Sequence, residues 1–229
     1  ARAAMAPDVL AAKQKEANAK LPLNWTVVNG EIRFTGTGYE NLCSVKDYAD
    51  FEMWVDWRIS KNGDSGIYLR GTPQVQIWDT TRVDVGANVG SGGLYNNKNN
   101  PSKPLKLMDN AINDWNTFFI RMVGEKVTVY LNGELVVDNV TLENYWDRKI
   151  PIFIKEQIEL QAHGTYVAYR NIFLRELDPV ATTPLSDAEQ KEGFVSLFDG
   201  SNLDKWIGNK TGYALEDGVI VTHPELGGG

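Results

Sequence analysis

The sequence has little of several residues on which common catalytic and binding sites depend. Its 229 residues include one cysteine, Cys43, and two histidines. A single cysteine cannot close a disulfide within the chain, and so few Cys and His residues all but exclude a zinc site built from these ligands. No stretch approaches the roughly 18 apolar residues that cross a bilayer, so we expect no membrane-spanning segment.

Positive charge is also scarce. Lys and Arg total 23 against 30 Asp and Glu, which gives a formal net charge of −7. A surface that binds the phosphates of nucleic acid needs an excess of positive charge. We therefore expect no nucleic-acid partner.

Aromatic residues and glycine are abundant by contrast. The chain has seven Trp, nine Tyr, eight Phe and 21 Gly. This combination fits an all-β fold with tight turns, and aromatic rings can also stack on sugars. Composition thus gives a fold class and only a hint of a ligand.

Most of the chain from Trp25 onward alternates polar and apolar residues with a period of two. The segment 51–59 (FEMWVDWRI) is the clearest case, and its two sets of side chains must point to opposite faces of a strand. Further strands are predicted at 66–71, 74–79, 117–123, 126–132 and 157–163. Asn132-Gly133 predicts a two-residue hairpin turn. Many short strands without a long helical pattern predict a sandwich of antiparallel sheets.

Four segments differ in composition. Residues 1–22 are rich in Ala and Lys and predict a short helical leader that begins near Pro7-Asp8. Residues 23–178 are the predicted β-sandwich domain. Residues 179–192 are a predicted linker, and the β pattern restarts at 193–229.

A repeat links the two ends of the chain. The residues of 25–32 and 213–220 share an aromatic residue, an alternating run, Asn/Asp-Gly and a final Ile. We interpret 193–229 as the opening segment of a second, truncated copy. Because an isolated hairpin is unstable in water, this segment packs on the first domain, pairs with another chain in a homo-oligomer, or belongs to a longer protein.

Six segments together resemble a known family. They are GFVSLFDGSNLDKW (193–206), DFEMWVDWRI (50–59), NGDSGIYLRG (62–71), QVQIWD (74–79), DWNTFFIRMVGEKVTVYLNGELV (114–136) and IELQAHGTYVAYRNIFLREL (158–177). Taken in this order, with the segment 193–206 first, they are similar to the 3-keto-disaccharide hydrolase family. This family is common in exported proteins of Bacteroidetes. The resemblance implies a concanavalin A-like jelly-roll sandwich, a carbohydrate substrate, cleavage of glycosides oxidised to a ketone at C3, and an exported, periplasmic or cell-surface location.

The alternation of side chains along the predicted strands can be compared with the implied carbohydrate substrate. If three of the predicted strands are neighbours, their polar sides form one wall of amides, charged groups and aromatic rings, the groups that a sugar site requires. The wall consists of Tyr68, Arg70, Gln74, Gln76, Trp78, Glu159, Gln161 and His163. Asp79 has the other parity but can turn into the site from its strand end.

The wider fold suggests a second comparison. Family 16 β-glucanases carry Glu-x-Asp-x-(x)-Glu on the equivalent strand, which supplies their nucleophile and general acid. The corresponding positions here are Gln74, Gln76 and Asp79. An amide can neither form a glycosyl ester nor donate a proton at neutral pH, so this motif does not support retaining hydrolysis.

A 3-ketone allows another route. It acidifies the hydrogen on C2, so a base can start a β-elimination at C1 that water then completes. The candidate catalytic residues are His163, Glu159, Asp79 and Arg70, with Arg70 as a donor to the enolate. The predicted substrate-binding residues are Tyr68, Gln74, Gln76, Trp78, Tyr95 and Gln161. The sequence does not assign base and acid among them.

Structural alternatives stay open for several of these residues. His163 precedes Gly164 and could serve only a turn, Arg70 and Glu159 could form a plain ion pair, and Asp79 could cap the long segment that follows. Asp64 is interpreted as a turn residue. A divalent cation is possible as a cofactor, although no contiguous ligand motif supports one. The competing function is a non-catalytic carbohydrate-binding module that uses the same face.

Overall fold

The computed structural model describes residues 5–177, 185–198, 200, 202–208, 210–216 and 219–222. The chain divides into two compact units, residues 1–176 and 177–229. The predicted linker lies in the second unit, and its residues 179–184 fall outside the described residues, as do residues 223–229 of the predicted second copy.

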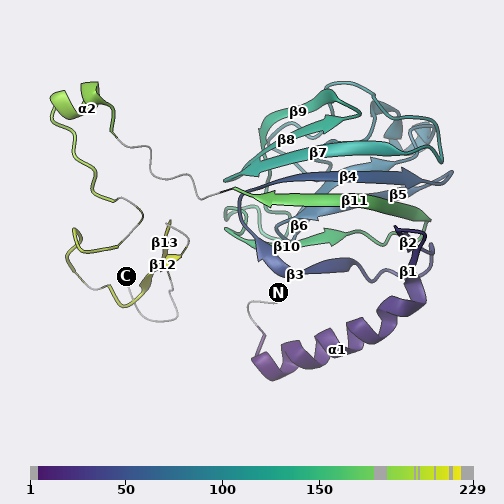
Figure 1. Cartoon of the computed structure of the whole chain (residues 1–229), viewed down its shortest axis with the longest axis horizontal. Coiled ribbons are helices and arrows are strands. Elements are labelled where there is room, and N and C mark those ends of the chain that lie inside the picture. Colours follow the sequence, from purple (N-terminus) through teal and green to yellow (C-terminus); the bar gives the residue numbers. More distant parts are fainter. Residues whose placement is uncertain are drawn as a thin grey trace. The chain divides into compact units, whose positions relative to one another are not determined.

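Two antiparallel sheets form the first unit (Figure 1). The seven-stranded sheet has the order β1 (Trp25–Val28), β2 (Glu31–Phe34), β11 (Val167–Glu176), β4 (Phe51–Ile59), β7 (Asn116–Val123), β8 (Lys126–Leu131) and β9 (Glu134–Thr141). The four-stranded sheet has the order β3 (Leu42–Tyr48), β10 (Glu156–Leu160), β5 (Asp64–Leu69) and β6 (Thr72–Trp78). The predicted jelly-roll sandwich is confirmed.

The core lies between the sheets and follows the alternation of the sequence. Along β4 the apolar set from Phe51 to Ile59 is buried, while the alternate residues are more exposed. The same core cluster contains Ile67, Val75 and Leu160 of the four-stranded sheet. The outer face of that sheet therefore carries the polar side chains of β5, β6 and β10.

Turn chemistry fixes the hairpin between β8 and β9. Asn132 and Gly133 have φ values of 54° and 86°, and Leu131 pairs directly with Glu134. Both central residues are thus in the left-handed region that a two-residue hairpin of this kind requires. The predicted Asn-Gly turn is confirmed.

Helix α1 (Pro7–Asn24) precedes the sandwich, begins at the predicted Pro7-Asp8 and ends two residues beyond the predicted leader. Asp8 lies in its first turn, and Ala6, at the N-cap, makes no side-chain capping bond. Leu21 packs against the core, although no residue of α1 is fully buried. None of the described helices is long and apolar enough to cross a membrane.

The long segment after β6 is ordered against the four-stranded sheet. It holds two short 3-10 helices, η2 (Val83–Val85) and η3 (Ala87–Val89). Beyond them, Gly92 donates its N–H to Gln76 O, and Gly93 O accepts from Gln76 N–H. The segment therefore extends the edge of the four-stranded sheet beside β6.

Glu143 organises the next part of this segment. Its carboxylate accepts the backbone N–H groups of residues 98, 99 and 100 and pairs with Arg148 at 2.6 Å. Burial opposes ionisation, but these hydrogen bonds outweigh it and lower the pKa of Glu143 to about 2. The carboxylate is a local anchor of the fold.

We expect Glu143→Gln to lower the free energy of unfolding by roughly 2–3 kcal/mol at neutral pH. Because the pKa is lower in the folded state than its ordinary 4.5, this stabilisation is complete above about pH 4.5 and is lost as pH falls towards 2. Urea titrations of both proteins at pH 7 and pH 3 measure it. If the free energies of unfolding of the two proteins differed by the same amount at both pH values, this account would be contradicted.

In the second unit, Ser186 begins helix α2 (Asp187–Lys191) through a capping box with Glu189. Part of the predicted linker is therefore helical. Strands β12 (Tyr213–Glu216) and β13 (Val219–Thr222) pair Tyr213 with Thr222, which matches the pairing of Trp25 with Phe34 at an offset of 188 residues. The truncated second copy, and a homo-oligomer formed through it, remain predictions.

Candidate active site

The outer face of the four-stranded sheet carries one cluster of polar side chains. Strand β5 begins at Asp64, two residues before the predicted strand, because Asp64 pairs with Trp78 of β6. This register places Asp64 and Tyr68 on the face that also bears the glutamines of β6. On the other side of β5, Tyr68 pairs with Glu159 of β10.

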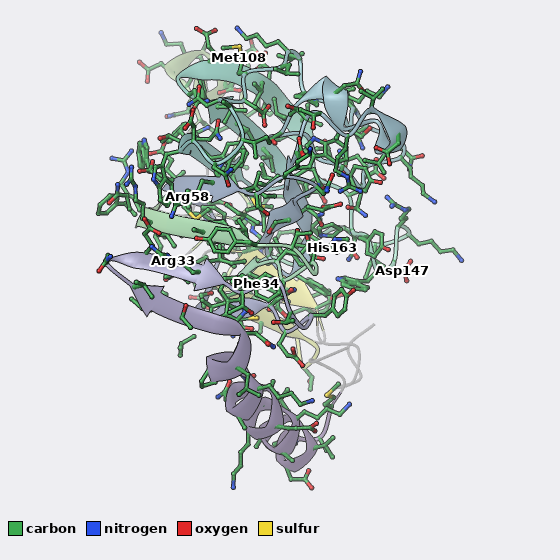
Figure 2. All side chains as sticks on the ribbon, turned by 90° about the vertical axis from the view of Figure 1, so that its right-hand side faces the viewer. Arg33, Phe34, Arg58, Met108, Asp147 and His163 are labelled. Atoms are coloured by element: carbon green, nitrogen blue, oxygen red, sulfur yellow. The ribbon has the colours of Figure 1, made fainter. Side chains whose placement is uncertain are left out.

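Asp64 joins His163 to the rest of the cluster. Its Oδ2 lies 3.8 Å from His163 Nδ1 and 3.8 Å from Arg82 Nη1, while its Oδ1 accepts a 2.8 Å hydrogen bond from Gln76 Nε2. The His163 side chain is 49% exposed. In Figure 2, His163 lies on the opposite side of the sandwich from Arg33 and Arg58. A carboxylate thus stands behind an accessible imidazole.

Glutamines connect this pair to Tyr68. Gln74 Nε2 donates to Gln76 Oε1 at 2.8 Å and to Gln161 Oε1 at 3.3 Å. Gly66 makes this possible, because a Cβ there would lie 2.4 Å from Gln74 Cγ. All three glutamines are buried, so they hold their neighbours in place more than they offer open surface.

Tyr68 is the donor at the centre of the cluster. Its hydroxyl oxygen accepts a 3.2 Å hydrogen bond from Gln161 Nε2, which leaves its own proton to be donated. Burial, reinforced by the nearby Glu159 carboxylate, raises the pKa of Tyr68. The phenol therefore stays protonated at neutral pH.

Glu159 is held by Asn41. Asn41 Nδ2 donates to Glu159 Oε2 at 2.9 Å, and Asn41 Oδ1 accepts the Ala162 N–H at 3.0 Å. The expected alternative, an ion pair between Glu159 and Arg70, does not form. Glu159 remains half-buried on the open side of the sheet.

Arg70 does not join the cluster, which differs from the prediction. Its guanidinium is 4% exposed and bonds Asp50 Oδ1 at 2.5 Å, Ala49 O at 2.8 Å and Phe153 O at 3.4 Å. Arg70 and Gly71 have φ values of 51° and 63° and form the turn between β5 and β6. Strand parity does not extend into such a turn, so the side chain is directed to backbone carbonyls.

Asp79 also lies apart from the cluster. It is fully buried and accepts hydrogen bonds from Asn62 N–H and from the N–H and hydroxyl of Thr81. Burial opposes ionisation, but these bonds prevail and lower the pKa of Asp79. Its carboxylate caps the long segment, as the structural alternative expected.

Trp78 and Tyr95 form a separate pair. Trp78 is 6% exposed, its Nε1 donates to Gly90 O at 2.8 Å, and its ring meets Tyr95 edge-on with centroids 5.4 Å apart. Trp78 therefore presents no open stacking face, whereas Tyr95 is 51% exposed. Of the predicted site residues, the cluster brings together Tyr68, Gln74, Gln76, Glu159, Gln161 and His163.

A groove of about 860 Å³ opens beside Glu159. One wall is α1, and the others come from β3, β10 and the loop that carries Trp146 and Phe153. Trp146 is 65% exposed, yet its Nε1 donates to Gly71 O at 2.8 Å. An exposed indole is thus held in one position at the rim.

Sequence reasoning missed Asp64, Asn41, Arg82 and Trp146. The parity of Tyr68 continues back through Gly66 to Asp64, so a signal existed, but Asn62-Gly63 suggested that the turn ended later. Asn41 and Trp146 lie outside periodic segments and gave no signal. Among the described residues, no group of three or more His, Cys, Asp and Glu side chains could hold a metal ion.

Solved structures with the same fold exist. Two proteins of Parabacteroides distasonis ATCC 8503, both provisionally named glycosyl hydrolases, align with TM-scores of 0.57 and 0.54. The first is 20% identical and the alignment covers 68% of this chain and 91% of that one. The second is 26% identical, with coverage of 67% and 74%. At this identity the first shows the fold alone.

Sequence comparison gives the family. No curated protein matches the chain. Residues 11–175 match the family described as the 3-keto-alpha-glucoside-1,2-lyase-like domain, and this span is well over half of the sequence. It contains both sheets of the first unit, apart from the last residue of β11, and the whole polar cluster. The chain belongs to the 3-keto-alpha-glucoside-1,2-lyase-like domain family.

Proposed function

We propose that this domain cleaves 3-keto-glycosides, including 3-keto-disaccharides, by elimination and hydration. The observation that carries the proposal is the exposed His163 backed by Asp64, on the same sheet face as Tyr68 and Glu159. The family description, which names a 1,2-lyase acting on a 3-keto-glucoside, supports the same chemistry. An exported location, periplasmic or at the cell surface, is part of the proposal.

The ketone at C3 makes the C2 hydrogen acidic. His163 takes this proton through its outward nitrogen, since Nδ1 faces Asp64. The electron pair moves into the C2–C3 bond and the negative charge develops on the C3 oxygen. Tyr68 donates its free hydroxyl proton as a hydrogen bond to that oxygen.

Elimination then breaks the bond between C1 and the leaving oxygen. The enolate re-forms the C3 ketone, a C1–C2 double bond appears, and a water molecule held by the Glu159 carboxylate gives a proton to the leaving oxygen. The hydroxide that remains adds to C1 while His163 returns its proton to C2. The net reaction consumes one water and releases a 3-keto-sugar and an alcohol, so the cluster ends in its starting protonation state.

A paired turnover assay tests the proposal. The purified chain is mixed with methyl 3-keto-glucoside and, separately, with its unoxidised parent, and the released 3-keto-glucose or glucose is quantified. Release from the keto form alone is expected, because the parent lacks an acidic C2 hydrogen. Cleavage of both at similar rates would overturn the elimination route. Binding of both without any release would instead favour the carbohydrate-binding module.

A further inference from the structure

The groove beside Glu159 is largely apolar, unlike the cluster that it adjoins. Its walls include Leu21 of α1, Leu42 and Val45 of β3, and the rings of Phe153 and Trp146. Its volume falls in the range that holds a whole small molecule rather than a single sugar ring. Glu159 and Asn41 line the groove and belong to the cluster as well, so the two sites are continuous.

Trp146 is the residue of the groove that points most clearly to a ligand. The exposed indole of Trp146 gains little stabilisation from burial, yet the hydrogen bond from its Nε1 to Gly71 O restricts the rotation of the ring. Arg70, at the same turn, anchors Phe153 O from within the protein. Both aromatic walls are therefore positioned from the β5–β6 turn, which indicates a built stacking surface.

We infer that this groove is the leaving-group subsite and that it takes a planar, mainly apolar aglycone stacked on Trp146. This inference rests on the proposed function, because a leaving-group subsite presupposes that a glycoside is cleaved. It places the aglycone on the Glu159 side of the cluster. Glu159 then faces the oxygen that departs from C1. Polar residues such as Gln14, Asn18 and Gln157 also line the groove, but the fixed indole of Trp146 offers a flat apolar surface on which an aromatic leaving group can stack.

Benzyl and methyl 3-keto-glucosides of one anomeric form test this inference, because their leaving alcohols have similar basicity. We expect kcat/KM for the benzyl compound to exceed that for the methyl compound about tenfold. Trp146→Ala should remove most of this preference by lowering kcat/KM for the benzyl compound. The matched control is Trp54→Ala, an exposed tryptophan on the outer face of the seven-stranded sheet.

Cys43 provides a readout that needs no turnover. It is the chain's single cysteine, it is exposed, and it lines the groove next to Glu159, with which it pairs between β3 and β10. Unoxidised benzyl glucoside should slow its alkylation by iodoacetamide at least threefold, whereas methyl glucoside at the same concentration should not.

The two readouts separate the two proposals. Protection of Cys43 without turnover of any 3-keto-glycoside supports the groove and refutes the proposed function. Turnover in which Trp146→Ala lowers both rates equally, with no protection of Cys43, refutes the groove and leaves the function standing.

Discussion

His163→Ala is expected to slow turnover of methyl 3-keto-glucoside by about 10²–10⁴-fold, the usual contribution of a general base. The imidazole is accessible and its Nδ1 is turned towards Asp64, so the loss should come from the missing base rather than from a missing contact. The affinity for the unoxidised parent should change little. Steady-state kinetics and a binding titration measure the two effects.

Two companion variants distinguish this role from a structural one. His163→Gln keeps a polar side chain before Gly164 but has no base, so it should be as inactive as His163→Ala. Added imidazole should restore part of the activity of the alanine variant, which a turn residue would not allow. Full turnover by His163→Gln, with unfolding unchanged, would remove His163 from the mechanism. Asp64→Asn should give a smaller loss of turnover, because the base remains but is less well held.

The catalytic and binding-module interpretations also separate at Tyr68. A binding module can use the phenol proton as a donor to a sugar oxygen, whereas the proposed elimination uses it as a donor to the oxyanion that develops at C3. The hydrogen bond from Gln161 and the raised pKa of Tyr68 together keep that proton and leave it for donation. A developing oxyanion gains more from such a donor than a neutral sugar oxygen does, so the arrangement suits the proposed elimination.

The parts of the fold that could be predicted are those with period-two patterning and turn chemistry. The segments 51–59 and 126–131 form strands and Asn132-Gly133 forms the turn, because alternating burial and positive φ values depend on residues that are close in the sequence. Most of the polar wall followed from the same parity. Parity fails where a strand ends, which is why Arg70 lies elsewhere, whereas Asp79 has the other parity and is buried instead of turning into the site.

The groove could not be predicted for a different reason. Its walls come from α1, β3 and an irregular loop, and only the three-dimensional arrangement brings these segments together. Trp146 stands in a segment without periodicity, and nothing in its neighbours shows that its ring is exposed and fixed. Asn41 likewise acts through a contact with Glu159 that spans 118 residues.

Arg70→Met is expected to cost about 3–5 kcal/mol of stability, because it leaves the carboxylate of Asp50 and two carbonyl oxygens without their partner. In a domain of this size, the melting temperature should fall by roughly 6–20 °C. The matched control is Arg121→Ala, which removes an exposed ion pair with Glu52 and should cost less than about 1 kcal/mol. Thermal unfolding followed by circular dichroism measures both changes.

The same variants decide whether Arg70 takes part in the chemistry. If it only anchors the turn and the Phe153 loop, Arg70→Met should turn over methyl 3-keto-glucoside within about threefold of the parent rate, well below its melting temperature. The double variant Arg70→Met/Asp50→Leu should recover part of the lost stability, since no unpaired buried charge is left. Turnover slowed about a hundredfold or more, with a melting temperature within about 2 °C of the parent, would instead make Arg70 a catalytic donor. The buried guanidinium, bonded to Asp50 and two carbonyls, makes us expect the first result.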